Sequence, residues 1–166
     1  LKRMKRPGTR ASYEILLAKM RVRLPGVTLR TTFIVGFPGE TEDDFNQLLE
    51  FIETVRFDHV GVFTYSLEEG TTAHALVDDV PASVKKKRQS RLMARQKQIV
   101  SARQRARVGE RTRLLVDGES REHELVLRGR LQGQAPDIDP QVYLTDVDPS
   151  QVRAGDFLDV EIAGAH

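Results

Sequence analysis

The stretch Leu29-Arg-Thr-Thr-Phe-Ile-Val-Gly-Phe-Pro-Gly-Glu-Thr-Glu-Asp-Asp-Phe45 decides how the first half of the chain folds. Residues 29–35 are mostly β-branched or aromatic, which is typical of a strand. Two glycines and a proline within 36–39 interrupt that pattern, because glycine allows left-handed backbone angles and proline fixes its own φ. Thr41, followed three residues later by Asp44, has the pattern of a capping box and predicts the start of a helix. The stretch is therefore one β-loop-α unit, and ligands often bind at the loop of such a unit.

Alternation along this strand gives it two different faces. The apolar face, which we expect to pack on helices, carries Leu29, Thr31, Phe33 and Val35. The other face carries Arg30, Thr32 and Ile34 and ends at Gly36, which has no side chain to exclude a ligand. This second face and the turn after it form a candidate binding site. The alternative is that the glycines and the proline only build a tight turn.

The first half of the chain reads as a series of β/α units. Apolar spacing predicts helices from Thr9 to about Arg23 and from Glu42 to about Val55, and a strand from His59 to about Thr64. A strand, a helix and a second strand in this order imply parallel pairing of the two strands. The connection from Tyr65 to Pro81 is long for a compact domain, and long connections often have a function.

Pro81 is predicted to begin the longest helix, which ends near Val108. The basic residues of this helix are Lys85, Lys86, Lys87, Arg88, Arg91, Arg95, Lys97, Arg103, Arg105 and Arg107. Two interpretations of this basic face stay open: a solvated helix surface, or contact with nucleic acid. No aromatic residues lie between the basic ones, which argues against stacking on a single strand.

From Gly109 onward the pattern changes to short strands separated by turn residues. Strands are predicted near 113–118, 124–128, 142–145 and 157–162. About five strands in so short a segment indicate a small closed β-barrel of the OB-like kind.

The charge of this second half is acidic, although the whole chain has a net charge of +2. Residues 109–166 contain six arginines against twelve carboxylates, which leaves −6, so the remainder of the chain carries +8. An acidic barrel repels phosphate and attracts a basic protein. The alternative is that these acids only keep the surface soluble.

Composition and motifs exclude several classes of function. The chain has 166 residues, 39% apolar and 30% charged, which indicates a globular protein of one or two domains. We expect a cytoplasmic protein, because no apolar run is long enough for a membrane span and no signal-peptide pattern is seen. The four histidines are scattered, so a zinc site is not expected. The acidic pairs Glu68-Glu69 and Asp78-Asp79 are interpreted as solvated loop residues.

The run Ile34-Val-Gly-Phe-Pro-Gly-Glu-Thr41 resembles the signature of the methylthiotransferases of the radical S-adenosylmethionine superfamily. Further matching pieces follow the same order: Leu1-Lys-Arg-Met-Lys-Arg-Pro7, Tyr65-Ser66, Glu69-Gly-Thr71 and Ala135-Pro-Asp-Ile-Asp139. The first and last of these resemble the branch that modifies an aspartate of a small-subunit ribosomal protein. They resemble less the branch that modifies adenosine in transfer RNA. The portion from Gly109 resembles a TRAM domain.

The resemblance implies an α/β fold in two parts. Residues 1–108 would be the last β/α units of an open, TIM-like radical-SAM barrel with a basic linking helix, and residues 109–166 would be a small all-β TRAM barrel. It also implies that S-adenosylmethionine is bound by Arg30, Ile34, Gly36, Pro38 and Gly39, with Ile34 against the adenine. The substrate, a basic ribosomal protein rather than RNA, would be bound by Asp137, Ile138 and Asp139. No catalytic and no metal-binding residue is assigned to this chain.

Family members hold two four-iron four-sulfur (4Fe-4S) clusters on cysteine thiolates, whereas this chain contains no cysteine. The chain therefore cannot bind either cluster in the family manner, and we expect it to be a C-terminal fragment that is inactive alone. Two alternatives stay open. The enzyme could belong to the transfer-RNA branch, or the chain could be a non-catalytic module that binds RNA or protein.

Overall fold

The computed structural model describes residues 4, 6–120 and 126–165, which fall into two compact units, Leu1–Ala102 and Arg103–His166. Within the described residues the fold is mixed α/β, with three α-helices and two sheets. The domain boundary that the sequence predicts after residue 108 stays a prediction. Most of the basic segment before Pro7, the start of the strand predicted at 124, and His123 and His166 lie outside the described residues.

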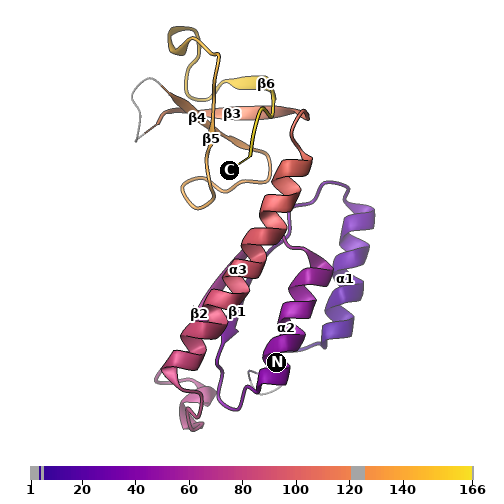
Figure 1. Cartoon of the computed structure of the whole chain (residues 1–166), viewed down its shortest axis with the longest axis vertical. Helices are drawn as coiled ribbons and strands as arrows, with labels where there is room; N and C mark the ends of the chain where they lie inside the picture. The colour runs from indigo at the N-terminus through magenta and orange to yellow at the C-terminus, as the bar shows by residue number, and fades with distance from the viewer. Residues whose placement is uncertain (1–3, 5, 121–125, 166) are drawn as a thin grey trace. The chain divides into compact units, whose positions relative to one another are not determined.

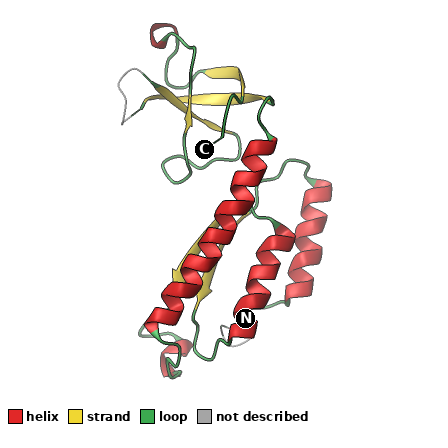
Figure 2. Ribbon diagram, viewed as in Figure 1, coloured by secondary structure: helices red, strands yellow, loops and turns green. Residues whose placement is uncertain are grey.

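The first unit contains two β/α repeats and a long helix (Figures 1 and 2). Its elements are α1 (Arg10–Arg23), β1 (Arg30–Val35), α2 (Glu42–Val55), β2 (His59–Thr64), the short 3-10 helix η1 (Thr72–Ala75) and most of α3 (Ala82–Ala106), whose last four residues belong to the second unit. β1 and β2 pair in parallel, with Arg30 opposite His59 and Val35 opposite Thr64, so the predicted parallel pairing is confirmed.

Local sequence explains where α1 and α2 begin. The Thr41 hydroxyl accepts a hydrogen bond from the Asp44 amide, and the Asp44 carboxylate accepts one from the Thr41 amide, so the predicted capping box is present. Thr9 and Ser12 form the same arrangement at α1. The acidic first turn of α2 suits the positive end of the helix dipole.

The core of the first unit lies between the strand pair and the helices. Its fully buried large side chains are Val35 of β1, Phe45 and Ile52 of α2, and Leu92 of α3. Each such side chain contributes about 1.5–3 kcal/mol by leaving water. Phe33 packs against this core from β1, so the apolar face of the first strand lies where the sequence predicts.

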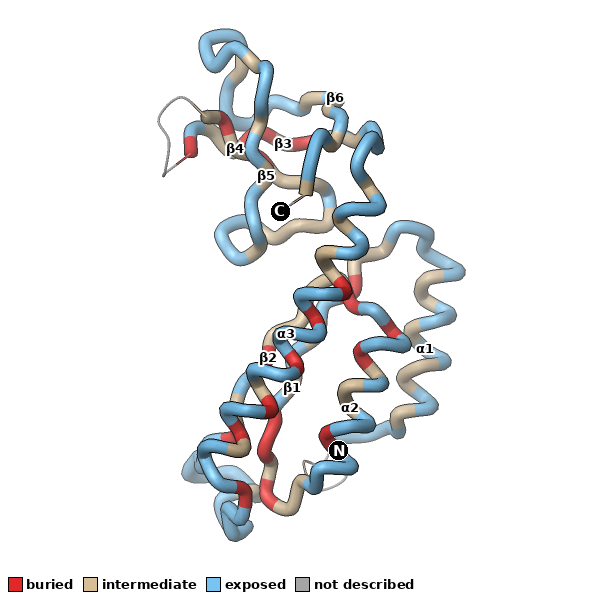
Figure 3. Tube along the Cα trace, in the orientation of Figure 1, coloured by how far each residue is buried: buried red, intermediate tan, exposed pale blue. Residues whose placement is uncertain are grey.

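Polar side chains of α3 also reach the strand region. Gln89 donates to the carbonyl of Val62 at 2.7 Å, and Gln96 donates to the carbonyl of Phe57 at 2.9 Å. These bonds satisfy backbone acceptors that the two-stranded sheet leaves open. Buried positions recur along α3 (Figure 3), and they include Lys85 and Arg88.

The second unit contains one antiparallel sheet in the order β5-β4-β3-β6. Its elements are β3 (Arg111–Glu119), β4 (Leu127–Leu131), β5 (Val142–Tyr143), the 3-10 helix η2 (Pro149–Gln151) and β6 (Phe157–Glu161). Leu114, Val116 and Leu127 are its buried apolar residues. At Gly129 a Cβ would lie 2.4 Å from Leu114 Cδ2 and 2.5 Å from the Leu115 carbonyl oxygen, so only glycine fits there.

The sequence predicts about five strands in a closed barrel, but the described residues form four strands in an open order. The prolines at 136, 140 and 149 explain part of the difference, because proline cannot donate to a strand ladder. These residues lie in the connections on either side of β5, which is only two residues long. In the part of the chain that the structure describes, no helix is both long and apolar enough to cross a membrane.

Candidate functional site

One face of the β1–β2 sheet is exposed in the described part of the chain. On β1 this open face carries Arg30, Thr32 and Ile34, all exposed, and Ile34 retains 42% of its accessible surface. Phe63 lies opposite Ile34 on β2 and is 62% exposed. Two large apolar side chains thus lie side by side on the surface of a sheet whose other face is buried, and such patches often mark ligand or partner sites.

The turn that follows β1, residues 36–40, is here called the glycine loop. Gly36 has φ of +74° and Gly39 has φ of +76°, so both glycines are needed for its path. The amide of Glu40 donates to the carbonyl of Phe37 at 2.8 Å, and the amide of Gly36 donates to Glu40 Oε1 at 2.9 Å. The Glu40 carboxylate therefore closes the loop onto its own first residue.

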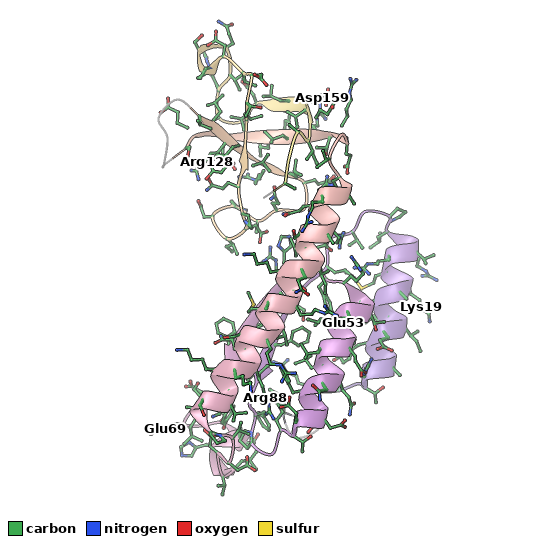
Figure 4. All side chains as sticks on the ribbon, in the orientation of Figure 1. Lys19, Glu53, Glu69, Arg88, Arg128 and Asp159 are labelled. Carbon is green, nitrogen blue, oxygen red and sulfur yellow. The ribbon has the colours of Figure 1, made fainter. Side chains whose placement is uncertain are left out.

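Arg88 of α3, which is labelled in Figure 4, holds that carboxylate in place. Its guanidinium donates to Glu40 Oε1 at 2.8 Å and to the Glu40 carbonyl at 3.1 Å. The Arg88 side chain is 6% exposed and that of Glu40 is 13% exposed, so this is a buried ion pair. Removing one partner of such a pair leaves the other charge buried and uncompensated.

Lys85 fixes the same loop from its other end. A Cβ built at Gly36 would lie 2.3 Å from Lys85 Cγ, so the stem of this lysine fills the space beside the glycine. Lys85 Nζ donates to Asp78 Oδ2 at 2.5 Å and to the Tyr65 carbonyl at 3.2 Å. It also lies 5.1 Å from the centre of the Tyr65 ring. A buried ammonium with several partners of this kind is satisfied.

The long connection after β2 also contacts the glycine loop. The amide of Gly39 donates to Asp79 Oδ1 at 2.6 Å. The rings of Phe37 and Tyr65 meet edge to face, with their centres 5.2 Å apart. The connection between Tyr65 and Pro81 thus packs against the glycine loop and helps to hold its shape.

These contacts correct one prediction. The sequence places Lys85 and Arg88 on a basic helix face that is solvated or binds nucleic acid, but both are buried and paired within the chain. The spacing of the buried α3 residues (85, 88, 92, 96 and 99) follows the helix period and could have revealed this error. The acidic pair Asp78-Asp79 is exposed, as the sequence predicts, and each of the two carboxylates also accepts a hydrogen bond.

Further basic residues of α3 pair with α2. Arg91 Nη1 lies 2.5 Å from Glu42 Oε1, and Arg95 Nε lies 2.5 Å from Glu53 Oε1. Hydrogen bonds from these arginines lower the pKa of both glutamates below the ordinary value. Much of the basic charge of α3 is therefore used inside the first unit.

The five predicted cofactor residues lie on the open face and in the glycine loop. Arg30 and Ile34 are exposed on the strand, Gly36 and Pro38 are buried, and Gly39 is half-buried. The sequence suggests that Gly36 is a glycine because a side chain would exclude a ligand. In the structure, a side chain at this position would first meet the stem of Lys85.

The three predicted substrate residues lie together on one loop of the second unit. Ile138 is 76% exposed at the tip of this loop, here called the acidic loop (residues 135–139). The amide of Ala135 donates to Asp139 Oδ2 at 2.6 Å, so Asp139 closes the loop. Asp137 has φ of +58°, a left-handed conformation that aspartate tolerates better than most residues.

Among the described residues, no group of His, Cys, Asp and Glu side chains could hold a metal ion.

Comparison with known proteins identifies a domain in the second half of the chain. Residues 108–166 match the model of the TRAM domain.

Nearly the whole chain is similar to proteins named ribosomal protein uS12 methylthiotransferase RimO. The relative from Trichlorobacter lovleyi is 50% identical over 98% of this chain and 35% of its own length. The relatives from Geotalea uraniireducens and Geobacter sulfurreducens are 45% and 44% identical, each over 98% of this chain and 36% of their own length. This chain is homologous to part of the RimO methylthiotransferases.

The RimO and TRAM resemblance drawn from sequence motifs is therefore confirmed. The chain spans about a third of the length of the RimO relatives that it matches. The four-stranded sheet of the second unit lies within the TRAM match.

Proposed function

We propose that this chain is part of a radical S-adenosylmethionine methylthiotransferase that modifies an aspartate of the small-subunit ribosomal protein uS12. The observation that carries the proposal is 50% identity to a RimO protein across 98% of the chain. The exposed, partly apolar sheet face and the TRAM match support it.

In this proposal, β1, α2 and β2 are β/α units of an open radical-SAM barrel, and the open face of the sheet faces the barrel interior. Ile34 packs against the adenine of S-adenosylmethionine, with Arg30 on the same strand. The glycine loop lies against the cofactor through Gly36, Pro38 and Gly39. The apolar surface of Ile34 and Phe63 fits a planar, weakly polar ring.

When bound, S-adenosylmethionine supplies the methyl group and the reactive radical chemistry. The residues of this chain contribute shape and position only: α3 fixes the glycine loop, and the loop forms part of the surface against which the ligand lies. Iron–sulfur clusters do not fit the residues present, since the chain has no cysteine. We therefore assign no step of the reaction to a cluster held by this chain.

The second unit would dock the basic ribosomal protein. Its sequence carries a net charge of −6, and its acidic loop presents Ile138 between two carboxylates. Opposite charges steer the two proteins together. The alternative of an RNA partner on the basic helix is weakened by the internal pairing of Lys85, Arg88, Arg91 and Arg95.

A chimera tests the proposal. The third of the Trichlorobacter lovleyi RimO that matches this chain is replaced by this chain, and the protein is expressed in a host that lacks its own RimO. We expect mass spectrometry to show one methylthio group on the aspartate of uS12. Modification of transfer RNA in its place would support the other branch, and a folded chimera that modifies neither would contradict the proposal.

A further inference from the structure

The second unit contains a hollow of about 190 Å³ whose lining arginines, Arg128 and Arg130, have no role in the function proposed above. Its wall is formed by β3, β4 and residues 134–141. The charged residues that line it are Asp117, Arg128, Arg130, Asp137 and Asp139. Arg128, after which we name it the Arg128 hollow, is labelled in Figure 4.

Most of the wall is fixed by contacts within the unit. Arg130 forms an ion pair with Asp117 across the β3–β4 pair. Gln134 braces the adjoining loop, since its Nε2 donates to the Pro140 carbonyl at 2.7 Å and its Oε1 accepts from the Leu131 amide at 2.7 Å. Asp139 is bound to the Ala135 amide. The hollow is therefore largely formed before any ligand arrives.

Arg128 differs from this wall. Its Nε is buried and has no hydrogen-bond partner among the described residues. A buried donor that gives up water without gaining an acceptor is unfavourable, and such groups are rare in folded proteins. Arg128 also lines the hollow, so its guanidinium can pair with an acceptor that is bound there.

We propose that the Arg128 hollow binds a single carboxylate side chain of an otherwise basic polypeptide. Both carboxylates and phosphates fit a guanidinium in a two-pronged manner. The surrounding Asp117, Asp137 and Asp139 disfavour a polyanion such as RNA. The same acids attract lysine and arginine residues that flank a lone carboxylate. The inference rests on the proposed docking of a basic protein and adds the group that this protein would insert.

The test uses the whole chain and two fluorescent peptides. Both peptides are short and lysine-rich, and they differ only in a central residue, which is aspartate in one and asparagine in the other. We expect the aspartate peptide to bind at least tenfold more tightly. Arg128→Gln should abolish that difference without weakening binding of the asparagine peptide, and Arg128→Lys should abolish most of it.

Arg153→Gln is the matched control, because it removes the same charge from an exposed position of the same unit. It should strengthen binding of both peptides slightly and equally, because the lost positive charge repels lysine. Circular dichroism checks that each variant is folded.

Equal affinity of the two peptides would overturn this inference, yet it would leave the docking of basic segments intact. Failure of both peptides to bind would contradict the docking as well. Binding of oligouridylate that depends on Arg128, without discrimination between the peptides, would overturn the assignment to a carboxylate.

Discussion

The glycine loop and the acidic loop are closed by the same kind of bond but are supported in different ways. In each, a carboxylate accepts the backbone N–H of the residue four positions earlier: Glu40 from Gly36 and Asp139 from Ala135. The Glu40 carboxylate is also bound by Arg88, which is 48 residues away in sequence. The acidic loop is closed by neighbours in sequence, and its tip is exposed. A loop that positions a cofactor needs a fixed shape, whereas a loop that meets a protein partner needs exposure.

The largest expected effect comes from removing the support of the glycine loop. Arg88→Met should destabilise the first unit by about 3 kcal/mol, because it leaves the Glu40 carboxylate buried without its cation. Urea unfolding measures the change. Replacing Glu40 with Leu in the same variant should recover much of the loss, since no buried charge then remains.

Arg91→Met is the matched control for this prediction. Arg91 lies one helix turn from Arg88 and pairs with Glu42, but its side chain is 41% exposed. Arg91→Met should therefore lower the free energy of unfolding much less than Arg88→Met does. Equal losses from the two substitutions would show that burial of the Arg88–Glu40 pair is unimportant.

The second effect isolates the contact between Gly36 and Lys85. Gly36→Ala should lower the free energy of unfolding by about 2 kcal/mol, because it combines a strained φ with a clash against the Lys85 stem. Gly26→Ala is the control, since Gly26 has φ of +78° and no atom within 4 Å of the added Cβ. Thermal unfolding of both variants gives the difference, and a smaller loss at Gly36 than at Gly26 would refute the contact.

Sequence predicted the parts of the molecule that local rules decide. The capping box of α2 involves residues three positions apart, and the parallel strand pair follows from the order of the elements. Burial of Arg88 was missed because its partner Glu40 lies 48 residues away in sequence. Burial of Lys85 was missed because its stem packs against Gly36, which is also distant in sequence. Charge alone suggested exposure there, although the helix period indicated the buried side.

The second unit repeats this lesson. The acidic loop lies where the sequence predicts, because its proline, its left-handed Asp137 and its closing Asp139 are all local. Closure of the sheet depends on pairing between distant strands, and the predicted closed barrel is not what the described strands form. The Arg128 hollow is formed by β3, β4 and residues 134–141 together, so no single sequence motif predicts it.

A third, smaller effect concerns docking by the acidic loop. Asp137→Asn with Asp139→Asn should slow association with the basic ribosomal protein, because two steering charges are lost. Added salt should also slow association of the unchanged chain with the ribosomal protein, since charges are screened over about 8 Å at physiological ionic strength. Stopped-flow fluorescence measures the rates. Association rates that are indifferent to both changes would mean that the acids only serve solubility.

The smallest effect concerns the pairs between α2 and α3. Arg95 lowers the pKa of Glu53 in the folded state, so this pair contributes stability above the unfolded pKa of the glutamate. The contribution is lost as pH falls through the lowered folded pKa. Melting temperatures between about pH 5 and pH 2 should therefore fall less steeply for Glu53→Gln. An unchanged slope would indicate that the pair does not form in solution.

Amide hydrogen exchange tests the central contrast between the two loops most directly. In the unchanged chain we expect the Gly36 amide to exchange only when the first unit unfolds, and the Ala135 amide to exchange through local opening. Arg88→Met should bring Gly36 to fast local exchange and leave Ala135 unaffected. Slow exchange at Gly36 in that variant, or equal protection of both amides in the unchanged chain, would contradict the account.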